Sequence, residues 1–155
     1  MYVRYQPSIS SWKPLSGENS HATLLEPVPN YAVPAPVPRA YAVDGVRVAD
    51  GDKAVRMTGD PAFDLQREVI LPAGPARPSD PAFHAEVRLT ALQPDRTIVE
   101  ATLSGPGHVV LVDTFDPGWH ASVDGKPAAL LRANVAFQAV PVPAGSHRVE
   151  LAYRP

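Results

Sequence analysis

Proline limits the folds open to this chain more than any other residue does. It occupies 19 of the 155 positions, more than twice the usual ~5%. A proline fixes φ and lacks the backbone N–H, so it breaks helix interiors but is tolerated in turns, at sheet edges and in extended segments. The proline content therefore excludes a helical bundle and favours a mainly β domain with an irregular approach segment.

The second half of the chain alternates with a period of two residues. In residues 85–91 the apolar side chains share one face and the polar side chains share the other, which is typical of a half-buried antiparallel strand. Residues 97–104 repeat the pattern, with Val99, Ala101 and Leu103 expected to point inward. Residues 108–115 are apolar on both faces, which predicts a central strand covered on two sides.

The last two apolar segments complete the expected sheet. Residues 135–142 and 147–153 are separated by Pro143-Ala144-Gly145-Ser146, a turn sequence, so we expect them to pair with each other. About seven strands then fall within residues 84–153, joined by short turns. That spacing is typical of an antiparallel β-sandwich.

Residues 113–134 form the stretch around which the rest can be arranged. Pro117-Gly118 breaks an apolar run, and Trp119 then begins a new extended segment in phase with Ala121 and Val123. Asp124-Gly125 follows, and Asp-Gly favours a two-residue type I′ hairpin because both central residues of that turn need positive φ. We therefore expect a strand, a tight hairpin and a further strand here.

Residues 1–83 are less regular, and we expect them to wrap the sandwich of residues 84–155 within one compact unit. The expected elements are a strand at 2–5, an extended Pro-rich strap at 27–38, a strand at 39–49 bent at Asp44-Gly45, a short helix near 52–58 capped by Asp50 or Asp52 and ended by Gly59, and a strand at 68–71. Asp-Pro-Ala-Phe occurs at 60–63 and at 80–83, which indicates repeated local capping and not a duplicated unit.

Composition excludes several classes of function. The net charge is −2 with no basic run, which argues against a nucleic-acid partner. The absence of cysteine removes disulfides, zinc-thiolate sites and thiol catalysis. The chain has no phosphate-binding glycine loop, so a nucleotide partner has no support. No run of 18 apolar residues is present, so this stretch of chain is not expected to span a membrane.

Three neighbouring residues form the candidate ligand site: Trp119, Asp116 and His120. A flat aromatic ring beside an acid and an imidazole suits the face of a sugar, but the phase of Trp119 with Ala121 and Val123 favours a place in the sandwich core. Asp113 and Asp116 flank a Pro-Gly turn, where Asp is favoured for backbone hydrogen bonding, so we expect no catalytic pair. The five histidines lack ligand spacing, and no metal or other cofactor is expected.

A second group of residues is expected to be structural. Asn134 lies between two strands and is expected to be buried and bonded to the Trp119 turn, while Arg39 and Tyr41 would pin the proline strap to the sandwich. The full set consists of Arg39, Tyr41, Pro117, Gly118, Asp124, Gly125, Asn134 and Gly145.

Residues 108–155 resemble the C-terminal soluble region of the YfhO-like family of bacterial multi-spanning membrane proteins. The resemblance rests on the combination Pro-Gly-Trp, Val-Asp-Gly, Ala-Asn and Pro-Ala-Gly-Ser-His within that range, and on the closing Tyr153-Arg154-Pro155. Upstream, Pro38-Arg39-Ala40-Tyr41, residues 63–71 and Val3-Arg4-Tyr5 look like the approach segment of the same family.

The resemblance implies a glycosyltransferase-like membrane protein of the class that uses lipid-linked sugars, with its catalytic groups on loops near membrane helices that this chain lacks. The chain would then be an excised extracytoplasmic C-terminal domain, non-catalytic itself, whose partners are the membrane-spanning portion of the parent protein and an acceptor glycan. The alternative is a free-standing carbohydrate- or protein-binding module of the cell envelope. A hydrolase is a third hypothesis, and it would need acidic or histidine side chains gathered in one cleft.

Overall fold

The computed structural model describes residues 4–7, 29–32 and 36–155. The chain divides into two compact units, Met1–Pro36 and Val37–Pro155. In the first unit, β1 (Arg4–Pro7) pairs antiparallel with β2 (Pro29–Ala32). The expected strap at 27–38 therefore contains a paired strand at residues 29–32, while residues 27, 28 and 33–35 lie outside the described residues. The division at residues 83 and 84 stays a prediction.

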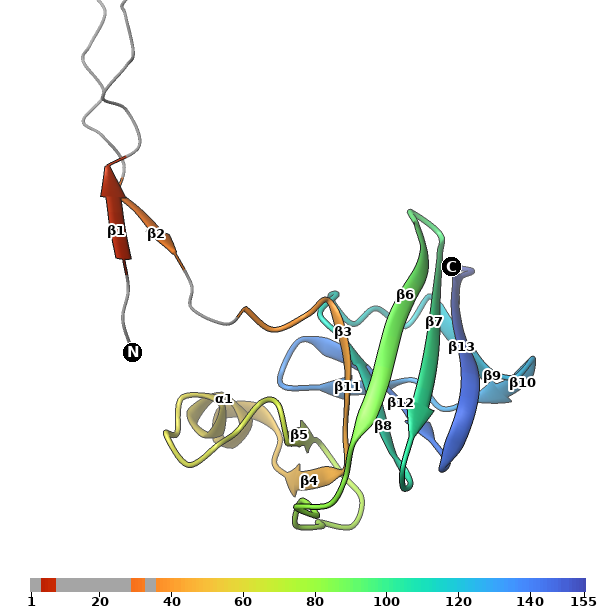
Figure 1. The fold of residues 1–155 in the computed structure, drawn as a ribbon, viewed down its shortest axis with the longest axis horizontal. Helices are drawn as coiled ribbons and strands as arrows, with labels where there is room; N and C mark the ends of the chain where they lie inside the picture. The colour runs from red at the N-terminus through yellow and green to blue at the C-terminus, as the bar shows by residue number, and fades with distance from the viewer. Residues whose placement is uncertain (1–3, 8–28, 33–35) are drawn as a thin grey trace, which may run out of the picture. The chain divides into compact units, whose positions relative to one another are not determined.

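Two antiparallel sheets form the body of the second unit, and they are drawn as two layers in Figure 1. The five-stranded sheet has the order β10 (Lys126–Ala128), β9 (Trp119–Val123), β13 (Gly145–Tyr153), β7 (Arg96–Leu103) and β6 (Ala85–Gln93). The four-stranded sheet has the order β11 (Leu131–Ala133), β12 (Phe137–Val142), β8 (Gly107–Leu111) and β3 (Ala40–Val43). The predicted mainly β, antiparallel fold with one short helix is confirmed; eight strands lie within residues 84–153, and β3 comes from outside that range.

The main core lies between the two sheets. Its buried side chains come from both layers and include Val99, Ala101 and Leu103 of β7, as the alternation predicts, together with Val149 and Leu151 of β13. The facing side chains from the other sheet are Ala40, Val109, Leu111, Val140 and Val142. Because each sheet buries one face against the other, the arrangement is a β-sandwich.

The β8 strand is covered on both faces, as its continuous apolar run predicts. Val109 and Leu111 contribute to the core between the sheets. Val110 belongs to a second buried cluster, which it shares with Val46 of β4 (Gly45–Val48) and Val69 of β5 (Glu68–Leu71). The two-stranded β4–β5 sheet, which is parallel, therefore covers the outer face of the four-stranded sheet.

The expected pairing of the last two apolar segments is wrong. The β12 strand pairs with β8 and β11, whereas β13 pairs with β7 and β9 in the other sheet. Three consecutive residues of β12, Gln138–Val140, are buried, so this strand needs cover on both faces, and the four-stranded sheet provides it. Alternate burial in β13 suits the five-stranded sheet, which has one solvent face. The short link around Pro143 and Ala144 therefore crosses between layers.

The short helix is confirmed close to its expected limits. It is α1 (Gly51–Thr58), with Asp50 as N-cap and Gly59 as C-cap. The helix lies in the connection between the parallel strands β4 and β5. Its buried residue, Ala54, shares a cluster with Ile70 of β5, so the helix packs against that strand.

The two Asp-Pro-Ala-Phe segments form the same local turn. In each, the aspartate carboxylate accepts a hydrogen bond from the backbone N–H two residues on, at 2.8 Å, and its carbonyl accepts one from the phenylalanine N–H. Local capping therefore explains the repeated sequence.

Candidate functional site

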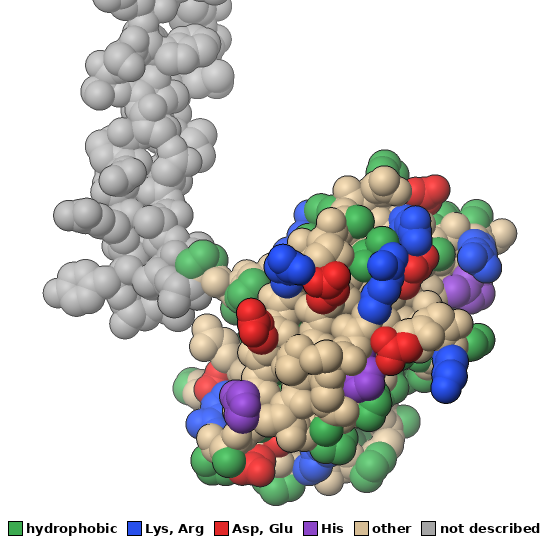
Figure 2. Space-filling view, turned by 45° about the vertical axis from the view of Figure 1, so that its right-hand side comes forward, with side chains coloured by type: hydrophobic (Ala, Val, Ile, Leu, Met, Phe, Trp, Pro, Cys, Tyr) green, Lys and Arg blue, Asp and Glu red, His purple; other side chains and the backbone are tan. Residues whose placement is uncertain are grey.

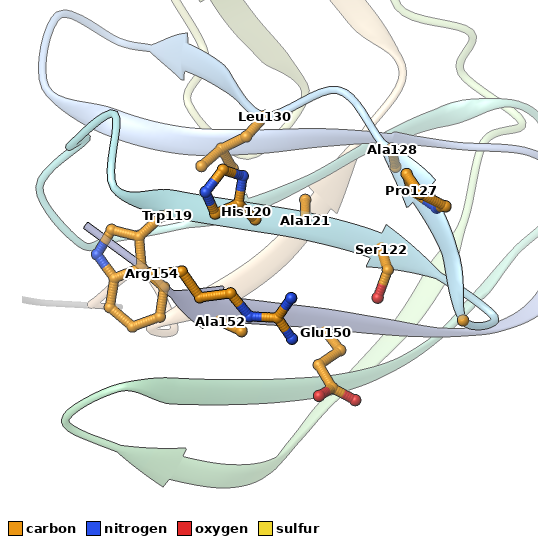
Figure 3. Close-up of a pocket in the computed structure, with 11 residues that line it drawn as sticks. Trp119, His120, Ala121, Ser122, Pro127, Ala128, Leu130, Glu150, Ala152 and Arg154 are labelled. Atoms are coloured by element: carbon orange, nitrogen blue, oxygen red, sulfur yellow. The ribbon is translucent and has the colours of Figure 1, made fainter.

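An open pocket of about 550 Å³ lies along the β9 and β13 strands at one end of the five-stranded sheet (Figure 3). Its lining combines one large aromatic ring, several polar side chains and a small apolar rim. The lining residues are Trp119, His120, Ala121, Ser122, Gly125, Pro127, Ala128, Leu130, Glu150, Ala152 and Arg154. We call this the Trp119 pocket.

The strand register explains which side chains meet at the Trp119 pocket. Trp119 is paired with Tyr153, and His120 with Ala152, in adjacent positions of β9 and β13. Because successive side chains of a strand point to opposite faces, Trp119 lies on the core side while His120 lies on the outer side. Ser122 and Glu150 are also paired and share the outer face with His120. The pocket therefore extends from the edge of the core onto the outer face of the sheet.

Trp119 combines the two roles that its sequence left open. Its side chain is half-buried and packs against the main core. The ring centroids of Trp119 and Tyr153 are 5.4 Å apart, with the planes tilted by 58°, a favourable aromatic geometry. The remaining surface of Trp119 lines the pocket. The ring is thus held in place by packing on one side and is accessible on the other.

Asp116 and Gly118 shape the turn that leads into β9. The Asp116 carboxylate accepts a hydrogen bond from the Gly118 N–H at 2.7 Å, and the Asp116 carbonyl accepts one from the Trp119 N–H. A Cβ atom at Gly118 would lie 2.6 Å from the Tyr153 ring, so only glycine fits beside that ring without a shift. Asp116 is absent from the residues that line the pocket, and the contacts described for it stabilise the Pro117-Gly118 turn.

The Asp124-Gly125 hairpin closes one side of the pocket. Both residues have positive φ, 51° and 77°, and Lys126 pairs with Val123 across the turn, as the dipeptide predicts. The Asp124 carboxylate accepts hydrogen bonds from the backbone N–H of Arg148, at 2.9 Å, and from the His147 ring, at 2.7 Å. These contacts hold the pKa of Asp124 below its usual value and hold the hairpin against β13.

Two charged side chains, Glu150 and Arg154, line the pocket, and they differ in their ion-pair partners. The Glu150 carboxylate accepts a hydrogen bond from Arg96 at 2.9 Å and lies 3.6 Å from a nitrogen of Arg148. The Arg96 contact lowers the pKa of Glu150. Arg154, which lines the same pocket, forms no ion pair with any residue in the described part of the chain. On the face drawn in Figure 2, Lys and Arg lie among Asp and Glu.

Sequence reasoning selected Trp119 and His120 but missed Ser122, Glu150 and Arg154. The missed residues follow from cross-strand pairing: Ser122 lies opposite Glu150, and β13 brings Arg154 next to β9. The alternation of β13 was visible in the sequence. Its neighbours were not, since the turn sequence at residues 143–146 predicts β12 as the partner of β13, whereas the partners are β7 and β9.

Asn134 is buried, as expected, but its partners differ from those expected. Its side-chain oxygen accepts a hydrogen bond from the Ile70 N–H at 2.8 Å, and its side-chain nitrogen donates to the Tyr41 hydroxyl at 3.3 Å. Its backbone N–H donates to the Ile70 carbonyl. Asn134 therefore joins the β11–β12 turn to β5 and not to the Trp119 turn. Burial raises the pKa of the Tyr41 hydroxyl, which keeps this phenol protonated.

The remaining structural candidates lie away from the pocket. Arg39 forms an ion pair with Asp113. Gly145 opens β13 with φ of 113°, a value that favours glycine. Within residues 4–7, 29–32 and 36–155, no three His, Asp or Glu side chains are placed to hold a metal ion.

A second, apolar pocket of about 360 Å³ lies between α1 and the β11–β12 turn. Its lining residues are Val55, Thr58, Phe63, Leu65, Asn134, Val135 and Phe137. Val135 is exposed and has φ of 76°, which is unusual for a β-branched residue.

One comparison with known proteins gives a match to the part of the chain that contains the Trp119 pocket. Residues 101–155 match the family model described as the bacterial membrane protein YfhO. This region is YfhO-like. The resemblance expected for residues 108–155 is thereby confirmed, and the upstream pieces lie outside the matched range. No curated protein and no solved structure matches the chain.

The YfhO-like region contains every residue that lines the Trp119 pocket, because the first of them is Trp119 and the last is Arg154. The match associates this region with a family of membrane proteins. Among the described residues, no helix has the length and apolar character needed to cross a bilayer.

Proposed function

We propose that this chain is a non-catalytic accessory domain on the extracytoplasmic side of a glycosyltransferase-like membrane protein of the lipid-linked-sugar class, and that it holds an acceptor glycan in the Trp119 pocket. The observation that carries the proposal is a Trp119 ring fixed by packing on Tyr153 and open to a polar pocket within the YfhO-like region. A fixed apolar ring face with hydrogen-bonding groups beside it suits the alternating apolar and hydroxyl surfaces of a sugar.

The non-catalytic part of the proposal is supported by the engagement of the carboxylates. Asp113 is paired with Arg39, Asp116 accepts a hydrogen bond from the Gly118 N–H, and Glu150 is paired with Arg96. General acid–base catalysis needs groups that converge on a substrate and can exchange a proton with it. These three carboxylates instead complete local structure.

Glycan binding is tested by titrating the full chain with neutral oligosaccharides, such as galactan and maltodextrin fragments, while amide and indole NMR signals are recorded. We expect shifts confined to β9, β13 and the Trp119 indole. Trp119→Ala should abolish them, and His120→Ala should weaken them without loss of fold, because His120 is exposed. His84→Ala is the matched control, since His84 is exposed and absent from the pocket lining. Shifts spread evenly over the surface, or none with any glycan, would reject the site.

The position relative to the membrane is tested separately. The chain has no cysteine, so Thr114→Cys, at an exposed position, gives this domain a single thiol for labelling within the parent protein. We expect a membrane-impermeant maleimide to label it in intact cells; labelling only after permeabilisation would place the domain on the cytoplasmic side. Recovery of the chain from cells as an independent product, separate from any membrane protein, would favour the free-standing module.

A further inference from the structure

The Trp119 pocket contains one cation that lacks an acidic partner. Arg154 lines the pocket and forms no ion pair or hydrogen bond through its guanidinium with the described residues. In the close-up, its side chain extends from the end of β13 along the pocket, over the side of the sheet that carries Ser122 and Glu150 (Figure 3). It is thus available to a ligand that lies across β9 and β13.

The acidic residue of the pocket, Glu150, already has cationic partners. Glu150 accepts the Arg96 hydrogen bond at 2.9 Å and lies near Arg148 as well. Arg96 reaches Glu150 from β7, which lies on the other side of β13 from β9, so the negative charge of Glu150 is balanced without Arg154. A neutral sugar would therefore leave the Arg154 guanidinium unpaired, whereas an anionic sugar would pair with it.

The chemistry of a single guanidinium distinguishes among anions. Its planar pair of N–H groups matches the two oxygens of a carboxylate, which carries one negative charge. A phosphate monoester carries about 1.5 to 2 negative charges near pH 7, more than the single Arg154 guanidinium balances. One free cation beside one neutralised acid thus suits a singly charged carboxylate.

We propose that the Trp119 pocket selects saccharides that carry a carboxylate, such as hexuronic acids, with Arg154 pairing with that carboxylate while the sugar ring lies against Trp119. The inference rests on the proposed glycan-binding function and adds the class of ligand. Arg154 is exposed and follows the last strand, so its replacement should leave the fold unchanged.

The experiment compares an oligogalacturonate with its fully methyl-esterified form, which lacks the charge and carries one added methyl group per residue, by calorimetric titration of the full chain. We expect the acid to bind at least about tenfold more tightly than the ester, a typical gain for a charge-assisted bidentate pair. Arg154→Gln should reduce binding of the acid to the level of the ester and leave the ester unaffected. Arg154→Lys should recover part of the difference, because it keeps the charge but loses the planar fork.

The control variant is Arg56→Gln, which removes the same charge from α1 and from outside the pocket; it should leave the acid-to-ester ratio unchanged. Equal binding of acid and ester, or an equal loss of preference in Arg154→Gln and Arg56→Gln, would overturn the role of Arg154 and leave the glycan site standing. Stronger binding of a sugar phosphate than of the uronate would overturn the choice of carboxylate. Failure of the acid, the ester and the neutral glycans to bind would overturn both the inference and the proposed function.

Discussion

The Nδ1 atom of His147 lies 2.7 Å from Oδ2 of Asp124, and the Nε2 atom of the same ring lies 3.1 Å from the Ala144 carbonyl oxygen. Both ring nitrogens therefore face acceptors. Only the protonated imidazole can donate from both nitrogens at once. These contacts raise the pKa of His147, with the Asp124 bond as the main cause, and they lower the pKa of Asp124. The pair links the hairpin beside the pocket to the start of β13.

The stabilisation that the Asp124–His147 pair provides should depend on pH. Because the pKa of His147 is raised in the fold, its contribution is complete below the usual histidine value of ~6.5 and is lost as the pH rises through the folded pKa. The pKa of Asp124 is lowered, so its contribution is present above the usual aspartate value and is lost as the pH falls through the folded pKa. The pair should thus stabilise the fold most between about pH 4 and 6.5.

The measurement is the melting temperature of the full chain between pH 3 and 9, compared with His147→Gln. The difference between the two proteins should be largest in that window and should shrink on both sides. Lys126 and the backbone N–H of Arg148 also act on the Asp124 carboxylate and lower its pKa. His84→Gln provides the control, since it removes an exposed histidine outside the pair. A constant difference at every pH would contradict the assignment.

Asn134→Ala should lower the free energy of unfolding by about 2–4 kcal/mol. The change leaves the Ile70 N–H without its acceptor, which costs about 1–3 kcal/mol when the group is buried. It also places alanine at φ of 46°, which costs about 1–2 kcal/mol. Urea unfolding of Asn134→Gly separates the terms, because glycine accepts that φ and should lose about 1 kcal/mol less. Equal losses for the two variants would show that backbone conformation plays no part.

Replacement of Val135 by glycine should relieve backbone strain at this position. With φ of 76°, this β-branched residue carries strain of about 1–3 kcal/mol, while its side chain is exposed. Val135→Gly should therefore raise stability by up to about 1 kcal/mol after the added entropy of glycine in the unfolded chain. Val135→Ala loses similar apolar surface but keeps a Cβ, so it should be neutral or destabilising. A gain in both variants would attribute the effect to the side chain.

Two glycines should differ in their tolerance of alanine. A Cβ at Gly107 would lie 2.7 Å from the Val43 carbonyl oxygen, which is fixed in β3, so Gly107→Ala should cost about 2–3 kcal/mol. A Cβ at Gly118 meets the Tyr153 ring, which is partly exposed and can move, so Gly118→Ala should cost about 1 kcal/mol or less. Chemical denaturation ranks the two, and the reverse order would contradict this account.

Removal of the Trp119 ring should cost about 2–4 kcal/mol, somewhat less than for a fully buried tryptophan, because part of the ring is open to the pocket. Trp119→Phe keeps the contact with Tyr153 and should retain most of the stability. Denaturation of both variants tests this. A loss near zero for Trp119→Ala would show that the ring contributes only to the surface.

The sequence by itself determined the local structure. Alternation placed Val99, Ala101 and Leu103 in the core, the continuous apolar run marked β8 as covered on both faces, and Asp124-Gly125 specified its hairpin. These features depend on side-chain periodicity and on backbone conformations that a few adjacent residues decide. They can therefore be predicted before any partner strand is known.

Tertiary structure alone decided which strands are neighbours. The alternation of β13 indicates one exposed face but does not name a neighbouring strand, and only the packing of the two sheets placed β13 next to β9. That placement brings Arg154 and Glu150 into one pocket with Trp119. In the same way, the packing of β5 next to the β11–β12 turn brings Asn134 to Ile70. Such contacts join residues far apart in sequence, so their identity depends on how the layers pack and not on the pattern within any one segment.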